Sequence, residues 1–186
     1  MTGDNFMWFP EKSGTAIAGE TTDEAFARRK AFEVTSFSFN MQASETTEET
    51  GSSGGSGKAK FGSFTIDKIV DSASVPLYKA CSMGTVFPTI MLAIRKVGGS
   101  PLLYLQYIFR YNQVTGITWS GGSGAERPKE TMVFTFKAMG VQYIQQKADG
   151  REGPKQQWSW NTSDQGGCTL DIKGIEPAPS FLSGSG

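Results

Sequence analysis

The feature that most constrains this chain is a series of strand-length segments separated by glycine-rich turns. In residues 102–119, aromatic and aliphatic side chains alternate with Gln106 and Arg110, and the segment closes at residues 121–124 (GGSG). A period of two is typical of a β-strand. Further segments of this kind lie at residues 31–41, 58–70, 86–97 and 130–147, and around Trp158 and Trp160. The chain is therefore predicted to be mainly β, with about seven antiparallel strands.

The segment 31–41 predicts a curled sheet rather than a flat one. Phe32 and Val34 share one face of the predicted strand. The next aromatic residues, Phe37 and Phe39, fall on the opposite face. Such a slip in the alternation marks a β-bulge or a strand that bends from one sheet into another. We therefore expect an antiparallel β-barrel built from two curled sheets.

One short α-helix is predicted from about residue 75 to residue 83. Residues 71–74 (DSAS) supply helix-capping side chains before it, and Gly84 offers a stop after it. Three apolar residues follow at positions i, i+3 and i+4, namely Leu77, Ala80 and Cys81. We interpret all three as core residues, and the cysteine as a small hydrophobe rather than a reactive thiol.

Residues 42–57 interrupt the pattern completely. This segment, QASETTEETGSSGGSG, carries Glu45, Glu48 and Glu49 without any Lys or Arg, and its end is rich in Gly and Ser. A connection of this length is unusual in a compact domain, and long loops are often functional. We interpret it as an exposed, flexible loop that extends from the barrel; the alternative is an insertion without function.

The C-terminal part of the chain also departs from the strand pattern. After Asn161 the alternation stops, and the sequence becomes rich in Gly, Ser and Pro. We expect residues 161–186 to be a tail of low or conditional order. Residues 1–160 would then form the β-barrel domain.

The composition excludes much of enzyme chemistry. The chain contains no histidine, so Ser-His and Cys-His nucleophile pairs and histidine metal sites are impossible. Two cysteines cannot form a zinc site or a disulfide framework. A near match to a phosphate-binding loop at residues 54–58 has Ser52 in place of the first glycine and Ala59 in place of the magnesium-binding Ser or Thr. We therefore predict no enzyme activity, no metal and no cofactor.

The charge balance bears on the partners and the location of the protein. Lys and Arg number 18, as do Asp and Glu, so the formal net charge is zero. Such a chain has no overall basic field to hold nucleic acid or anionic lipid. No apolar stretch is long enough to span a bilayer, and the N-terminus shows no signal peptide. We expect a protein that folds in the cytoplasm and acts through its surfaces, including its edge strands.

Five short segments occur in an order that a known family shares. They are residues 17–21 (IAGET) with 37–39 (FSF); 57–61 (GKAKF) continuing to 66–68 (IDK) and 71–77 (DSASVPL); 93–96 (AIRK); 107–110 (YIFR); and 141–143 (VQY) with 147–150 (KADG). Together they resemble the hemolysin-coregulated protein (Hcp) family. The likeness covers roughly residues 5–160.

The resemblance implies the inner-tube protein of the bacterial type VI secretion system. Members of this family form a β-barrel with one flanking helix and assemble as homohexameric rings. The rings stack into a hollow tube inside a contractile sheath, with a trimeric spike and a baseplate as further partners, and small effector proteins can travel in the lumen. Contraction expels the tube from the cytoplasm into the medium or a target cell, by a route that uses no signal peptide.

On the same resemblance, the extended loop reaches toward a neighbouring ring or subunit. The contact residues expected from it are Glu45, Thr46, Thr47, Glu48 and Glu49 in the loop, with Lys58 and Lys60 beside it. Arg95 is a further basic group for the loop glutamates to meet.

Two other functions are compatible with the sequence. A tube protein of a related contractile injection device, or of a phage tail, would share this architecture. A protein of another class, a monomeric β-sandwich, would bind carbohydrate through exposed members of the four tryptophans, Trp8, Trp119, Trp158 and Trp160.

Overall fold

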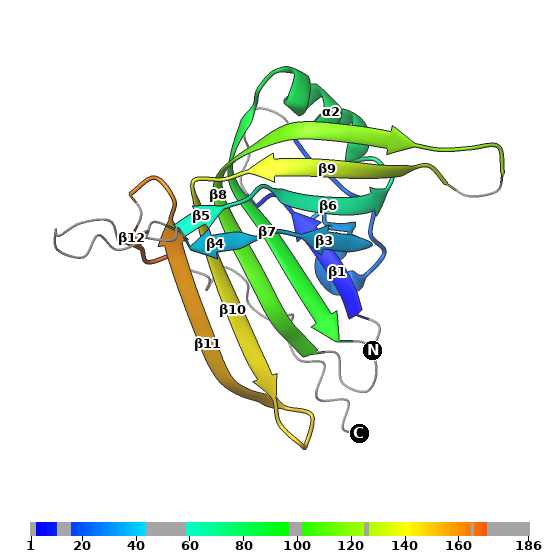
Figure 1. Ribbon diagram of the computed structural model, residues 1–186. Coiled ribbons are helices and arrows are strands. Elements are labelled where there is room, and N and C mark those ends of the chain that lie inside the picture. The colour runs from blue at the N-terminus through cyan, green and yellow to red at the C-terminus, as the bar shows by residue number, and fades with distance from the viewer. Residues whose placement is uncertain are drawn as a thin grey trace, which may run out of the picture.

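The computed structural model describes residues 3–10, 16–43, 59–96, 102–124, 127–164 and 166–170. These residues form a large antiparallel sheet, a two-stranded hairpin and two helices (Figure 1). The prediction of a mainly β fold with curled antiparallel sheets is confirmed. Among the described strands, the order is open at its ends, so this sheet curls without closing into a complete barrel.

The large sheet consists of a long path and a branch. The long path runs, in spatial order, through β12 (Gly166–Gly167), β11 (Glu152–Asn161), β10 (Ala138–Gln146), β8 (Leu102–Ser120), β7 (Val86–Lys96), β1 (Gly3–Trp8) and β2 (Phe32–Glu33). The branch leaves β8 through β9 (Lys129–Thr135), β6 (Phe64–Ile69) and β3 (Ser36–Ser38). The separate hairpin pairs β4 (Met41–Ala43) with β5 (Ala59–Phe61).

Strand β8 belongs to both parts of the sheet. Its first half pairs with β7 and β10, whereas its second half pairs with β9. The change of partner falls close to Tyr111, whose φ of 53° is a left-handed conformation that costs a non-glycine residue about 1–3 kcal/mol. The strand changes direction at this position, so its end crosses over the long path (Figure 1).

The main core lies between the long path and the branch. Its largest fully buried side chains come from both parts and include Phe64, Ile66, Phe87, Ile90, Leu92, Phe109, Met132 and Phe134. Burying a side chain of this size contributes about 1.5–3 kcal/mol. Helix α2 (Ser74–Ser82) adds Leu77 and Ala80, which are fully buried, while Cys81 is half-buried and packs against the same cluster.

Helix α2 lies close to its predicted position, although its start differs in detail. Gly84 follows its end with a φ of 62°, the left-handed conformation that glycine adopts at low cost, as predicted. The N-cap is Ala73, which has no side chain able to cap. Asp71 instead accepts a hydrogen bond from the Ala73 amide, so it meets the positive end of the helix.

A second helix, α1 (Glu24–Ala27), corrects the prediction of a single helix. It is one turn long and lies in a polar segment without a helical period. Asp23 caps it by accepting the amide of Ala25, and Phe26 stacks on Phe6 with ring centroids 4.0 Å apart. None of the helices in the described ranges has the length and apolar character needed to cross a membrane.

The segment 31–41 is not one strand. The structure divides it among β2, β3 and β4, which pair with β1, β6 and β5 respectively. The bend predicted between Val34 and Phe37 is therefore confirmed. This division helps to raise the number of strands in the described ranges to twelve, against the predicted seven or so.

Strands also enter the two segments predicted to be irregular. Strand β4 extends to Ala43, so the first two residues of the predicted 42–57 loop lie in a strand. Strand β12 follows Asn161 and pairs with the end of β11, within the predicted tail. Residues 44–58 and 171–186 lie outside the described residues.

The carboxylate of Asp67 on β6 links the three strands of the branch. It accepts hydrogen bonds from Ser36 on β3 and from Thr131 on β9, the latter at 2.6 Å. These two hydrogen bonds favour the ionised carboxylate and lower the pKa of Asp67 below its ordinary value of 3.8.

Replacing Asp67 by asparagine should lower the free energy of unfolding at neutral pH. The free energy of unfolding of the variant should also decrease less than that of the wild type as the pH falls. Because the pKa of Asp67 is lower in the folded state, its contribution is complete above the unfolded-state pKa, near 3.9, and is lost as the pH falls through the folded-state value. Urea unfolding at pH 7, 5 and 3 measures the difference between wild type and Asp67→Asn, which should shrink at pH 3. A difference that stays constant over this range contradicts the prediction. Asp149→Asn, in an exposed turn, is the control.

Candidate interaction surfaces

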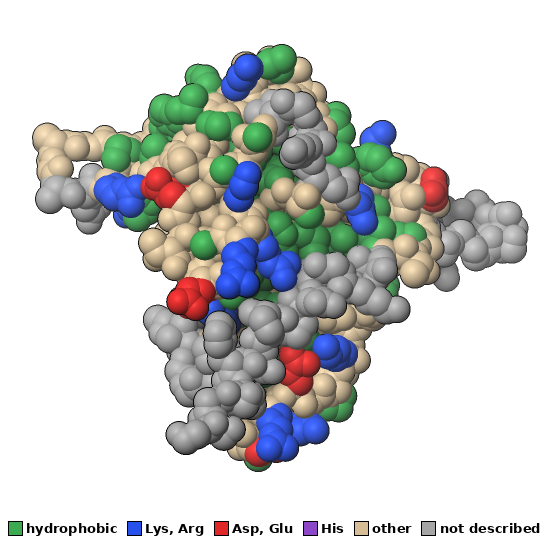
Figure 2. All heavy atoms as spheres, turned by 180° about the vertical axis from the view of Figure 1, so that it is seen from behind, with side chains coloured by type: hydrophobic (Ala, Val, Ile, Leu, Met, Phe, Trp, Pro, Cys, Tyr) green, Lys and Arg blue, Asp and Glu red, His purple; other side chains and the backbone are tan. Residues whose placement is uncertain are grey.

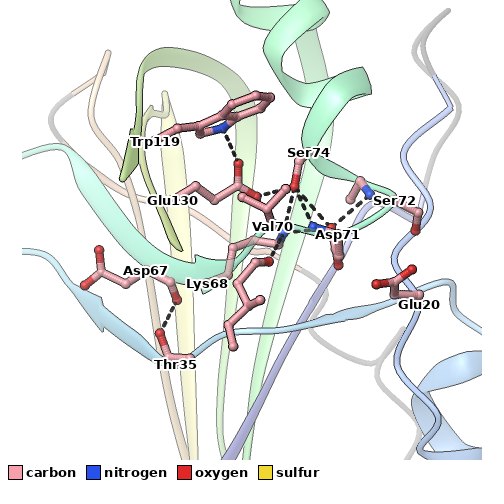
Figure 3. A network of polar contacts seen from close by, with 12 residues as sticks. Glu20, Thr35, Asp67, Lys68, Val70, Asp71, Ser72, Ser74, Trp119 and Glu130 are labelled. Carbon is pink, nitrogen blue, oxygen red and sulfur yellow. Dashed lines mark hydrogen bonds and ion pairs between the residues drawn. The ribbon is translucent and has the colours of Figure 1, made fainter. Parts of the chain in front are cut away.

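A buried polar network joins α2 to the branch of the sheet (Figure 3). Its centre is Lys68 on β6, which is only 1% exposed. The Lys68 ammonium donates to Glu130 Oε1 on β9 at 2.6 Å and to Asp71 Oδ1 at 2.7 Å. It also donates to the hydroxyl of Ser74, in the first turn of α2. The network therefore connects β6, β9 and the start of the helix.

Glu130 extends this network to the end of β8. Its carboxylate is as buried as Lys68, and it accepts a hydrogen bond from the Ser74 hydroxyl. The indole Nε1 of Trp119 donates to Glu130 Oε2 at 2.7 Å. Figure 3 shows the Trp119 ring above Glu130, with its nitrogen directed at the carboxylate. Both oxygens of Glu130 are therefore hydrogen-bonded.

The network constrains geometry more than it adds stability. Removing two charges from water costs several kcal/mol per ion, which a close, fully hydrogen-bonded pair offsets. Loss of one partner leaves the other charge buried and unpaired. The start of α2 and the ring of Trp119 are consequently held in one arrangement relative to the sheet.

The outer surface above this network is apolar. We define the helix patch as the exposed residues of α2, its C-terminal end and the neighbouring strand ends: Val75, Tyr78, Met83, Val86 and Trp119. Tyr78 and Trp119 are 55% and 48% exposed, and their ring centroids lie 5.4 Å apart. In the view from behind, hydrophobic side chains gather over the upper part of the molecule, where α2 lies (Figure 2). Rigid exposed aromatic residues of this kind are typical of protein interfaces.

A second surface is the outer edge of β11. Within the described ranges, no strand pairs with this edge from Glu152 to Trp158. Strand β12 pairs with Trp160 and Asn161, and the Cys168 amide donates to the Ser159 carbonyl. Trp158 is 42% exposed and stacks on Trp160, with ring centroids 5.8 Å apart. An unpaired edge offers backbone donors and acceptors to another chain.

The base of the extended loop lies beside β11. Ala43 on β4 pairs with Ala59 on β5, so the chain leaves and re-enters the described structure at one place around residues 44–58. Phe61, at the end of β5, stacks on Trp158 with ring centroids 6.4 Å apart. Of the predicted contact residues, Lys60 is exposed on β5. The others, Glu45, Thr46, Thr47, Glu48, Glu49 and Lys58, lie outside the described residues.

Arg95, the other basic residue considered for the loop, has partners within its own subunit. Its Nη2 lies 2.9 Å from Asp4 Oδ2 and 2.6 Å from Asp23 Oδ2. Burial alone would lower the pKa of Arg95, but the hydrogen bonds to Asp23 and Asp4 outweigh burial and raise the pKa. Lys60, by contrast, has no ion pair to any residue in the described ranges, so it is better suited to meet the loop glutamates.

Comparison with known proteins identifies the family. The family model described as "Type VI secretion system effector, Hcp" matches residues 6–143. The chain belongs to the Hcp family. The matched range contains α2, the buried network and the helix patch, and it ends within β10.

Solved structures share the fold of this Hcp-family chain. A type six secretion system protein superposes with a TM-score of 0.79 at 28% identity, covering 90% of this chain and 100% of that chain. Hcp1 from Salmonella typhimurium gives a TM-score of 0.70 at 25% identity, with the same coverage of both chains. Protein hcp1 of Pseudomonas aeruginosa is 35% identical over 101 residues, which are 53% of this chain and 61% of that protein.

Sequence reasoning missed the buried network, although a signal was present. Lys68 follows Phe64 and Ile66 at a period of two, which places it on the buried face of the strand. Its partner Glu130 is distant in the chain, and only the pairing of β6 with β9 brings the two residues opposite each other.

Replacing Lys68 by methionine should lower the free energy of unfolding by about 3–5 kcal/mol, because Glu130 would remain buried without its counter-charge. Urea unfolding followed by tryptophan fluorescence measures this change. The same substitution at exposed Lys79 on α2 should change the value by less than about 0.5 kcal/mol. Equal stability of Lys68→Met and wild type would show that the ion pair does not hold the helix.

Proposed function

We propose that this chain is the subunit of the inner tube of a type VI secretion system. It assembles as a hexameric ring, and the rings stack into a hollow tube that a contractile sheath expels. The observation that carries the proposal is the Hcp family match over residues 6–143. A fold shared with a type six secretion system protein over 90% of the chain supports it.

The open edges of the sheet support assembly into a ring. The long path ends near β11, and the branch ends at β3, which pairs only with β6 among the described strands. Two different edges of identical subunits can pair head to tail, and such a contact closes into a ring when the rotation between subunits allows it. We assign the β11 edge to this contact because it is long and carries the exposed ring of Trp158.

The loop at residues 44–58 is proposed to contact a neighbouring ring or subunit. Because Ala43 pairs with Ala59, the chain leaves the described structure and returns to it at one point, beside β11. Its glutamates Glu45, Glu48 and Glu49 would meet Lys58 and Lys60 of a neighbour. Each exposed ion pair contributes only about 0.2–1 kcal/mol, but repetition around a ring adds these contributions through avidity.

The remaining surfaces have roles as partner contacts. The helix patch supports binding to proteins around the tube, namely the sheath, the trimeric spike and the baseplate, since its aromatic side chains are fixed before binding. Small effector proteins are the proposed cargo of the lumen. The subunit is structural rather than enzymatic; it assembles in the cytoplasm, is expelled into the medium or a target cell, and neither binds nucleic acid nor inserts stably into a membrane.

The alternative functions have weaker support. A tube subunit of a phage tail or of a related injection device would share the architecture, but the matching family belongs to type VI secretion. Carbohydrate binding by a monomer would need tryptophans gathered on one exposed surface. Trp8 is buried, Trp119 lies against α2, and Trp158 with Trp160 lies on β11, so the four do not form one platform.

Negative-stain electron microscopy of the purified protein tests the proposed function. We expect six-fold rings, or stacks of rings, at moderate protein concentration. Isolated small particles that persist at high concentration would contradict a tube subunit. Tryptophan fluorescence of the wild-type protein, measured with and without added oligosaccharide, then tests the alternative of a monomeric carbohydrate-binding protein.

Charge reversal tests the role of the loop separately. The triple variant Glu45→Lys, Glu48→Lys, Glu49→Lys should form rings but stack them less, because like charges then face each other. Adding Lys58→Glu and Lys60→Glu restores opposite charges and should recover stacking, measured as tube length in micrographs. Unchanged tube length in the triple variant would show that these glutamates make no stacking contact.

A further inference from the structure

A pocket of about 410 Å³ lies between the end of β5 and the turn that joins β9 to β10. Phe61 and Phe136 both line it, and their ring centroids lie 6.3 Å apart with the rings edge to face. Ser63, Thr135 and Thr162 add hydroxyl groups to the lining. The pocket therefore combines two aromatic walls with polar groups, a composition that is typical of binding pockets.

Phe61 connects this pocket with the exposed aromatic residues of β11. Its ring stacks on Trp158 with an interplanar angle of 22°, and Trp158 stacks on Trp160 with an angle of 19°. The three rings are thus nearly parallel and form a continuous aromatic surface beside the pocket. Aromatic side chains that are already packed lose little conformational freedom on binding, so this surface is suited to hold an apolar side chain of a partner.

The charges at the pocket are positive. Lys60 lines the pocket, is exposed and has no ion pair to any other described residue. Lys137, which directly follows Phe136, is also exposed and also has no ion pair within the described ranges. The Lys137 carbonyl accepts a hydrogen bond from the hydroxyl of Thr162, so its backbone lies next to the pocket lining. Two lysines without counter-charges favour a carboxylate at this place.

We propose that this pocket binds a segment of a partner protein that carries an apolar side chain beside a carboxylate. The apolar side chain lies against Phe61 and Phe136, and the carboxylate accepts a hydrogen bond from the Lys60 ammonium. Lys60, Ser63 and Thr135 are exposed, so the pocket is open on one side. Such a pocket takes one side chain of a polypeptide more readily than a small molecule, which needs most of its surface buried.

The occupant is a different protein rather than a second copy of this chain. Of the ten large hydrophobic residues that are exposed in the described ranges, none is adjacent in sequence to an Asp or a Glu. The described surface of a second copy therefore offers no matching segment. The inference does not rest on ring assembly. Lys60 is also the proposed partner of loop glutamates, but peptide affinity and tube length are separate measurements, so either proposal can fail alone.

A peptide titration of the full-length protein tests the inference. The probe is N-acetyl-phenylalanyl-glutamic acid amide, and its uncharged glutamine analogue is the matched control. Binding is followed by tryptophan fluorescence, and Trp158→Phe identifies the reporting ring. We expect saturable binding in the millimolar range, about threefold tighter for the glutamate peptide, because an exposed ion pair has a small effect. Lys60→Gln should make the two affinities equal, whereas Lys79→Gln on α2 should leave their ratio unchanged.

A second variant tests the position of the site. Ser63→Phe places a large side chain at an exposed position of the lining and should abolish binding of both peptides, while urea unfolding confirms that the domain stays folded. Absence of saturable binding to wild type would overturn the proposal. Equal affinities of the two peptides for wild type would exclude the carboxylate contact, and unchanged binding to Ser63→Phe would place the site elsewhere; either result also overturns it.

Discussion

The backbone hydrogen bonds along β8 are the constraint on which the rest of the structure depends. This strand is the only described one that pairs with β7, β10 and β9, so it positions the long path and the branch relative to each other. The strained conformation of Tyr111 marks the change of direction. Without that bend, the apolar sides of the two parts would not face a common core.

Buried charge then sets the orientation of the surface. Lys68 and Glu130 lie opposite each other because β6 pairs with β9, and they select the one placement of α2 that satisfies both. The exposed ring of Trp119 is tied to the same carboxylate. An interior hydrogen-bond network thereby holds the Trp119 ring of an exterior apolar patch in one orientation.

Local patterns predicted most of the fold but little of the candidate surfaces. Alternation identified the long strands, and Leu77, Ala80 and Gly84 located α2, because these signals depend on near neighbours in sequence. The one-turn helix α1 was missed because it is held by Phe26 against β1, a contact between distant residues. Lys68 was overlooked because a lysine is normally solvent-facing, and Glu130 becomes its partner only through tertiary pairing. The sequence indicated Lys60 but not that the next residue, Phe61, stacks on Trp158.

The pairing of Ala43 on β4 with Ala59 on β5 affects how the sequence of such a protein can change during evolution. The entropic cost of joining two fixed chain ends rises only with the logarithm of the number of residues between them, about 0.6 kcal/mol for each doubling. Insertions and charge changes between these two alanines therefore have little effect on the stability of the domain. Natural selection can therefore change the length and the binding specificity of this connection without changing the packing of the main core.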